Sequence, residues 1–173
     1  MTPAPFRFEP LGPEHDRSAF HCGEEALDRY FQTQVTEDIR RRVTNCFVAI
    51  EIVSNRIAAY YTLSAASIPL NGLPESVTKR LPRYPTLPAV RIGRLAVDEK
   101  FQGRGLGAAM LMNAVHRTLR DAAAAYALLV DAKNEPAVAF YERHGFGRLA
   151  GQPRTLYLPL ATAQKALLKR TTH

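Results

Sequence analysis

Short blocks of apolar residues run through the first half of the chain, and their pattern predicts strands. The blocks at residues 6–10, 46–53 and 56–64 have strand length, and the last two are rich in β-branched and aromatic residues. Ser54 and Asn55 separate these two blocks, which predicts a two-residue turn. The N-terminal half should therefore contain a hairpin.

A helix beginning near Glu24 is expected between the first and second blocks. Its apolar positions recur at helical spacing and define a packing side: Leu27, Tyr30, Phe31 and Val35. The polar positions between them are expected to face solvent: Asp28, Arg29, Gln32 and Gln34. Three arginines, Arg40 to Arg42, follow directly. Cations suit a helix C-terminus, so a solvated helix end and a phosphate contact are both open interpretations.

The second half alternates strand and helix patterns. A strand is expected at 90–98, a helix from Ala108 to about Ala124, and a buried strand at 126–132. The last of these is a nearly continuous apolar run, as is typical of parallel or mixed sheets. Residues 67–88 are richest in proline and turn residues and resemble a loop, with a short helix at 75–80.

Length and composition indicate one globular domain. The chain has 173 residues, of which 46% are hydrophobic and 23% are charged. Its apolar runs are shorter than the ~20 residues of a membrane span. The N-terminus lacks the basic-then-apolar pattern of a secretory signal. We therefore expect a cytoplasmic protein that does not enter a membrane.

The charge balance favours a polyanionic partner. Lys and Arg number 23 against 16 Asp and Glu, which gives a formal net charge of +7. Such an excess favours nucleic acid without identifying it. Cys22 and Cys46 lie far apart with no nearby Cys or His partner. We expect neither a metal site nor a disulfide, and both cysteines should behave as small apolar residues.

A glycine-spaced loop joins the strand at 90–98 to the following helix. It reads Gln102-Gly103-Arg104-Gly105-Leu106-Gly107. Glycine allows a close approach of the backbone to an anion, and the first N–H groups of a helix lack intrahelical partners. The spacing matches neither the dinucleotide-binding nor the Walker pattern. A pyrophosphate site is the functional interpretation, and a tight strand-to-helix turn is the structural alternative.

A second block follows the strand at 126–132. Asn134 is a suitable N-cap, Pro136 suits a first helical turn, and Gly145 is placed to end the helix. This block also contains adjacent aromatic residues, Phe140 and Tyr141. Phe140 can face the sheet and is the better core candidate.

These two blocks together resemble the GNAT acetyltransferases. The glycine loop is similar to their Gln/Arg-x-x-Gly-x-Gly/Ala signature, and residues 134–146 are similar to their Asn-x-x-Ala-x-x-Phe-Tyr-x-x-x-Gly-Phe block. The resemblance implies one GNAT domain over residues 1–173. It also implies an α/β fold with a twisted mixed sheet, splayed central strands and flanking helices.

The resemblance also implies acetyl-coenzyme A as co-substrate, with no metal. The residues implied at its site are Leu95, Ala96, Val97, Gln102, Gly103, Arg104, Gly105, Leu106, Gly107, Ala108, Asn134, Phe140 and Tyr141. Tyr141 matches the family's general acid, which protonates the departing thiolate. Its structural alternative is a core aromatic.

No general base stands out. Glu51, Glu99, Glu142 and His144 are candidates without a motif. A free α-amine, with a pKa of about 7.7–8.0, needs less help from a base than lysine at about 10.4. The missing base therefore favours an α-amine acceptor.

From Phe20 to Pro159 the chain resembles the GNAT toxins of type II toxin–antitoxin systems. The similar segments are Phe20-His21-Cys22-Gly23 with residues 27–31, Tyr60-Tyr61-Thr62-Leu63-Ser64, Arg83-Tyr84-Pro85 with residues 88–98, and Val130-Asp131-Ala132-Lys133. The resemblance implies acetylation of the amino group of aminoacyl-tRNA, which blocks translation. It also implies a homodimer and a ribbon-helix-helix antitoxin, with operator DNA bound only through that antitoxin.

The basic residues proposed for tRNA are Arg40, Arg41, Arg42, Lys79, Arg80, Arg83, Arg91 and Arg94. Phosphate contacts supply much of the affinity for nucleic acid, which suits an arginine-rich chain. Each of these residues could instead be ordinary solvated surface. Two other functions remain open: an acetyltransferase acting on a small-molecule amine or a protein N-terminus, and a non-catalytic co-repressor.

Overall fold

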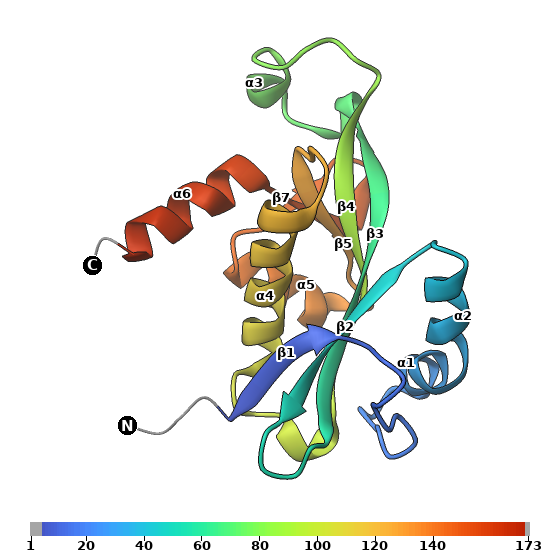
Figure 1. The fold of residues 1–173 in the computed structure, drawn as a ribbon. Coiled ribbons are helices and arrows are strands. Elements are labelled where there is room, and N and C mark those ends of the chain that lie inside the picture. Colours follow the sequence, from blue (N-terminus) through green and yellow to red (C-terminus); the bar gives the residue numbers. More distant parts are fainter. Residues whose placement is uncertain (1–4, 172–173) are drawn as a thin grey trace. The chain divides into compact units, whose positions relative to one another are not determined.

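The computed structural model describes residues 5–171, which form a seven-stranded mixed sheet with helices (Figure 1). The strand order is β1-β2-β3-β4-β5-β7-β6. The strands are β1 (Phe6–Pro10), β2 (Asn45–Glu51), β3 (Ile57–Pro69), β4 (Thr86–Val97), β5 (Ala127–Asp131), β6 (Gly147–Leu149) and β7 (Gln152–Pro159). Strands β4 and β5 are parallel, whereas β1–β2, β2–β3, β5–β7 and β6–β7 are antiparallel. The expected mixed α/β fold is confirmed.

The helices are mostly short. They are α1 (Glu25–Arg29), the π-helical turn η1 (Tyr30–Gln34), α2 (Val35–Arg40), the 3₁₀ turns η2 (Leu70–Gly72) and η3 (Glu99–Phe101), α3 (Glu75–Thr78), α4 (Leu106–Asp121), α5 (Glu135–Arg143) and α6 (Leu160–Thr171). Helix α4 therefore begins and ends earlier than the sequence pattern predicts. In the described part of the chain, no helix is long and apolar enough to cross a membrane.

The chain divides into two compact units. The first contains the residues up to Ser64 together with Gly93–Ala114, and the second contains Ala65–Ile92 and Val115 onward. The boundaries fall inside β3, β4 and α4, so the chain passes between the units within regular elements rather than within loops.

The first unit contains the predicted hairpin. Strand β2 pairs with β3, and a register shift follows Ala49. The turn is longer than the two residues expected, because Glu51 ends β2 and its N–H donates to the Arg56 carbonyl at 2.9 Å. Asn55 adopts a left-handed conformation with φ of 60°, which Asn tolerates better than most residues.

Three aromatic rings form the centre of the first unit. Phe31 stacks on Tyr60 with ring centroids 4.2 Å apart and an interplanar angle of 7°. Phe20 meets both rings edge-on, at 5.0 and 5.4 Å. Phe31 and Tyr60 are fully buried, and the Tyr60 hydroxyl donates to the Leu27 carbonyl at 2.7 Å. The apolar side expected for the first helix is confirmed, because Tyr30, Phe31 and Val35 are buried and Leu27 packs against the same core.

Asp28 contradicts the polar face expected for the same helix. The residue is only 6% exposed, and its Oδ1 accepts a hydrogen bond from the Cys22 N–H at 2.8 Å. A buried carboxylate needs such partners, and the preceding loop supplies one here. The expected exposure of Arg29, Gln32 and Gln34 is confirmed.

The second unit is built around the buried strand β5. This strand pairs with β4 from Ala89↔Ala127 to Ile92↔Val130, and with β7 on its other side. Helix α5 packs on β7, and α6 packs on β5 and β7. Helix α3 lies in the loop that joins β3 to β4 (Figure 1), which confirms the short helix predicted there.

Phe31 provides a direct test of the first unit's core. Phe31→Ala should lower the free energy of unfolding by about 3–5 kcal/mol, because it deletes a fully buried, stacked ring. Val53, which is 93% exposed, is the control, and Val53→Ala should change stability by less than about 0.5 kcal/mol. Urea unfolding followed by circular dichroism measures both. A loss below about 1 kcal/mol for Phe31→Ala would contradict the packing described.

Candidate active site

A buried aspartate holds the turn between β4 and the glycine loop. Asp98 is 3% exposed, and its N–H donates to the Ala58 carbonyl at 2.8 Å. Its Oδ1 accepts from the Lys100 N–H at 3.0 Å, and its Oδ2 accepts from the His21 N–H at 2.9 Å. The carboxylate therefore joins a turn of one chain segment to the backbone of a distant one.

The glycine loop requires glycine because of its backbone angles. Gly103 and Gly105 have φ of 80° and 78°, a region that residues with a side chain rarely adopt. A Cβ built on either glycine would meet nothing within 4 Å, so space is not the constraint. The Gly105 carbonyl accepts the Ala109 N–H at 3.1 Å, and α4 begins here. The N–H groups of its first turn lack intrahelical partners.

Two exposed side chains of the loop, Gln102 and Arg104, differ in their contacts. Gln102 Nε2 donates to the Val97 carbonyl at 2.8 Å and to the Cys22 carbonyl at 3.0 Å. The Arg104 guanidinium donates to the Lys100 carbonyl at 3.3 Å and remains exposed. A full positive charge therefore accompanies the open start of α4, as an anion site requires.

The end of β4 belongs to the same unit. Ala96 is buried in the first unit's core, whereas Leu95 and Val97 are half-buried. Alternate residues of a strand point to opposite faces, so Leu95 and Val97 share the face that Ala96 does not use. Leu106 is buried, so it can offer a ligand little beyond its backbone.

In the second unit, Asn134 and Gly145 bound α5 as expected. The Asn134 side-chain oxygen accepts the Ala137 N–H at 2.9 Å. Gly145 has φ of 94°, and its N–H donates to the Glu142 carbonyl, while the Phe146 N–H donates to the Tyr141 carbonyl. This pair of bonds is a Schellman motif.

The burial of the two aromatic residues of α5 is the opposite of the sequence-based expectation, in which Phe140 is the better core candidate. Tyr141 is 7% exposed, whereas Phe140 is half-buried, so Tyr141 is the core residue. The Tyr141 ring meets Phe140 and Phe146 edge-on. Burial raises the pKa of its phenol to about 12. Within residues 5–171 no hydrogen bond uses the Tyr141 hydroxyl, so a neutral O–H group is available to a ligand.

Each of the four candidate bases has another contact. Glu51 accepts from the Ser54 hydroxyl at 2.6 Å, and Glu99 lies 3.8 Å from His21 Nε2. Glu142 accepts long contacts of 3.4 Å from Arg148. His144 Nδ1 donates to the Phe140 carbonyl at 2.8 Å. The structure therefore does not single out a base among them.

Half of the basic residues proposed for nucleic acid already have partners. Arg40 and Arg41 share the Glu37 carboxylate. Arg91 pairs with Asp131, and Arg94 lies over the Tyr30 ring at 3.4 Å. The other four are exposed and form no ion pair within the described residues: Arg42, Lys79, Arg80 and Arg83.

Sequence reasoning missed a histidine–aspartate contact beside the glycine loop. His21 Nδ1 lies 2.9 Å from the buried Asp28 Oδ2, a close electrostatic contact without the alignment of a hydrogen bond. The Glu99 N–H donates to the His21 carbonyl at 2.9 Å. The only signal in the sequence was the proximity of His21 and Asp28 along the chain. Among the described residues no cluster of His, Cys, Asp and Glu could hold a metal ion.

Comparison with known proteins identifies the family to which this chain belongs. The sequence profile of the acetyltransferase (GNAT) family matches residues 15–146, and the chain belongs to that family. It is 31% identical to a tRNA-acetylating toxin of Mycobacterium tuberculosis over 86% of this chain and 89% of that protein. It is 27% identical to the probable toxin TacT of Sinorhizobium fredii over 92% and 93%, respectively.

Solved structures of similar proteins have the same fold as this chain. A mutant of KacT superposes with a TM-score of 0.86 at 28% identity, covering 94% of this chain and 99% of the other. AtaT complexed with acetyl-methionyl-tRNAfMet gives 0.84 at 29% identity, with the same coverage.

Related structures contain further ligands and partners. AtaTR bound with AcCoA gives a TM-score of 0.79 at 28% identity, covering 94% of this chain and 98% of the other. An AtaT mutant bound to the C-terminus of its antitoxin AtaR gives 0.77 at 26%, covering 94% and 99%. A KacTA–DNA complex gives 0.78 at 26%, covering 95% and 99%.

Burial of the Tyr141 phenol should make the stability of the protein fall at high pH. Because the pKa of Tyr141 is raised to about 12 from 10.0, the unfolded chain loses this proton first as the pH rises. The stabilising contribution is complete below pH ~10 and is lost as the pH rises through ~12, at about 1.4 kcal/mol per unit.

Urea unfolding of wild type and Tyr141→Phe from pH 9 to pH ~12 measures this contribution. The phenylalanine variant should lose less stability over the window, and the difference removes the shared effect of the other tyrosines. Parallel stability curves for the two proteins would contradict burial of the phenol.

Proposed function

We propose that this chain is the toxin of a type II toxin–antitoxin system. It transfers acetyl from acetyl-coenzyme A to the amino group of aminoacyl-tRNA and so blocks translation. The observation that carries the proposal is its likeness, over 99% of that chain, to AtaT complexed with acetyl-methionyl-tRNAfMet. The tRNA-acetylating relative of M. tuberculosis, matched over 89% of its length, supports the same substrate.

The acetyl donor is proposed to bind through its pyrophosphate to the glycine loop. The positive φ of Gly103 and Gly105, the open N–H groups at Leu106–Ala108 and the exposed Arg104 support this assignment. The pantetheine arm is assigned to the strand end at Leu95–Val97. The Val97 carbonyl already accepts the Gln102 amide, so Gln102 acts by shaping the loop. Asn134 and Phe140 are the other residues proposed to contact acetyl-coenzyme A.

Tyr141 is proposed to stabilise the departing thiolate. A thiol has a pKa of about 8.5, and the buried phenol has a pKa of about 12. Complete transfer of the phenol proton to the thiolate would therefore be uphill by about 5 kcal/mol. The hydroxyl is better suited to donating a hydrogen bond as the C–S bond breaks, and its high pKa keeps that hydrogen in place at physiological pH.

The acceptor is proposed to be an α-amine. Its nitrogen forms the bond to the acetyl carbon, the sulfur leaves with the C–S electron pair, and the excess proton on nitrogen passes to solvent. An α-amine, with a pKa of about 7.7–8.0, is neutral in part at physiological pH. This acceptor fits a chain in which Glu51, Glu99, Glu142 and His144 all have other contacts.

The charged tRNA is proposed to contact basic residues of each compact unit, and these residues differ in their availability. Arg42, Lys79, Arg80 and Arg83 are exposed and can meet phosphates directly. For Arg40, Arg41, Arg91 and Arg94, a phosphate would compete with the contacts that these side chains already make.

We place the toxin in the cytoplasm, as a homodimer, with a ribbon-helix-helix antitoxin that carries it to operator DNA. The antitoxin and DNA complexes of AtaT and KacT support these partners. The family match spans parts of both compact units, so we treat residues 1–173 as one GNAT domain.

The substrate can be tested by labelling. Purified protein incubated with labelled acetyl-coenzyme A and total charged tRNA should transfer label to the RNA fraction. Mild alkaline hydrolysis of the aminoacyl ester should then release the label as an N-acetyl amino acid. Deacylated tRNA is the control and should stay unlabelled. Label confined to added polyamines or peptides would instead show a small-molecule or protein amine acetyltransferase.

Tyr141→Phe tests the proposed mechanism. Loss of the hydroxyl should lower kcat about 10²- to 10³-fold, as removal of one transition-state hydrogen-bond donor does elsewhere. Acetyl-coenzyme A affinity, measured by calorimetry, should change by less than about twofold, because the ring and its packing remain. Unchanged kcat would remove Tyr141 from the mechanism.

A further inference from the structure

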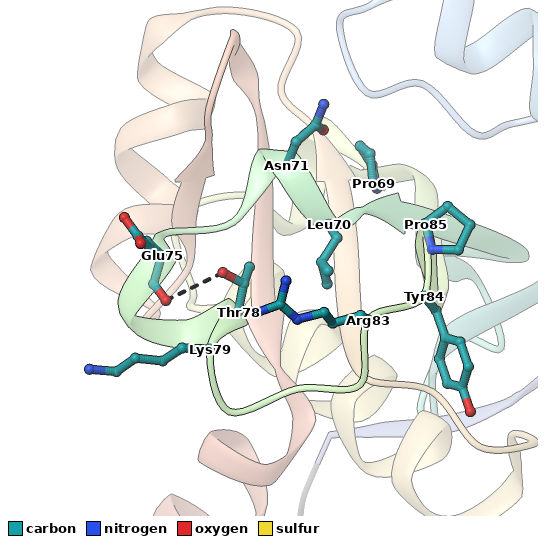
Figure 2. Close-up of a pocket in the computed structure, with 9 residues that line it drawn as sticks. All are labelled: Pro69, Leu70, Asn71, Glu75, Thr78, Lys79, Arg83, Tyr84 and Pro85. Atoms are coloured by element: carbon teal, nitrogen blue, oxygen red, sulfur yellow. Dashed lines mark hydrogen bonds between the residues drawn. The ribbon is translucent and has the colours of Figure 1, made fainter.

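The loop between β3 and β4 contains a hollow that the acetyl-transfer chemistry does not use. Its volume is about 740 Å³, within the range of pockets that hold small ligands. Its lining residues are Pro69, Leu70, Asn71, Glu75, Thr78, Lys79, Arg83, Tyr84 and Pro85, all from one compact unit. Figure 2 shows Leu70 and Arg83 in the middle of the hollow, with Tyr84 at one edge and Lys79 at the opposite one.

Tyr84 is largely exposed and makes no aromatic or cation–π contact within the described residues. It is 62% exposed, whereas Tyr30, Tyr60, Tyr61, Tyr141 and Tyr157 are buried. Its phenol forms no hydrogen bond within residues 5–171. An aromatic ring in this situation gains little for the fold, and its exposed part can pack against a planar ligand.

The β3–β4 loop carries positive charges that form no ion pair within the described residues. Lys79, Arg80 and Arg83 are exposed and form no ion pair in the part of the chain that the structure describes. Glu75 is the one acidic residue in the lining. Arg40, Arg91, Arg94 and Arg104 instead contact a carboxylate, a ring or a carbonyl. This loop therefore concentrates cations that can bind an anion.

The loop is also stiff where it presents these groups. Pro82 and Pro85 flank Arg83 and Tyr84, and proline restricts both its own φ and the residue before it. The Leu70 N–H donates to the Pro85 carbonyl at 3.1 Å and closes the base of the loop. The backbone of Arg83 and Tyr84 therefore loses little conformational freedom when a ligand binds to their side chains.

We infer that this hollow binds unpaired nucleotides of RNA, with a base stacked on Tyr84 and the adjoining phosphates on Arg83 and Lys79. Unpaired bases expose a π face, whereas bases inside a duplex are stacked on each other and are not available to the ring. An acidic peptide would satisfy the cations but would leave the ring unused. The inference rests on the proposed function, because the unpaired 3′ end of charged tRNA is the single strand that such an enzyme must hold.

Binding of a short single-stranded RNA ending in CCA, followed by fluorescence anisotropy, tests the inference. Tyr84→Ala should weaken binding about 5- to 100-fold, the effect of losing one stacked base, whereas Tyr84→Phe should stay within about twofold. Leu168→Ala, at a position also 62% exposed, is the matched control and should bind as wild type does. Arg83→Ala should reduce the slope of log K against log salt by about 0.7.

The same RNA annealed into a blunt duplex should bind weakly and show no dependence on Tyr84. Equal binding of the single strand by wild type and Tyr84→Ala would overturn the inference, as would tighter binding of the duplex. An acidic antitoxin peptide whose affinity, rather than that of RNA, depends on Tyr84 would assign the hollow to the antitoxin instead.

Kinetics separate this inference from the proposed function. Tyr84→Ala should raise KM for charged tRNA while leaving the rate with a small aminoacyl ester unchanged. If wild type labels charged tRNA and Tyr84→Ala has the same KM, the hollow is wrongly assigned and the function stands. If wild type labels no tRNA, the function fails, and the anisotropy measurement still decides whether the hollow binds RNA.

Discussion

The carboxylate of Asp98 is the constraint on which the proposed donor site depends. It is buried at the end of β4, and both its oxygens accept backbone N–H groups, one from Lys100 and one from His21. A buried carboxylate left without these bonds would be costly, so the two segments must stay together in the folded state. The glycine loop begins only four residues further on, and its position is thus set by a group that need not touch a ligand.

The total charge of the chain differs from the charge that is available to a ligand. The formal charge of +7 counts every basic residue equally. In the structure, Glu37 offsets one of the two charges of Arg40 and Arg41, and Asp131 offsets the charge of Arg91. The cations that remain uncommitted include a group in the β3–β4 loop, and this distribution rather than the total indicates where a polyanion would bind.

Local signals predicted much of the fold, whereas contacts between distant segments were not predictable. Asn134 and Gly145 could be recognised because helix capping depends on a few neighbouring residues. The burial of Asp28 depends on a turn of preceding chain, and the pairing of Arg91 with Asp131 joins two strands. Phe140 and Tyr141 are adjacent on one helix, where a rotation of about 100° separates their directions, so only packing decides which is buried.

The interleaving of the two compact units has a consequence for synthesis on the ribosome. The first unit needs Gly93–Ala114 in addition to the N-terminal segment, and residues 65–92, which emerge in between, belong to the second unit. The second unit in turn needs β5 and β7 near the end of the chain. Neither unit can be completed early, so the usual order in which N-terminal parts fold first cannot apply fully here. The nascent chain is therefore expected to stay inactive until most of it has been translated.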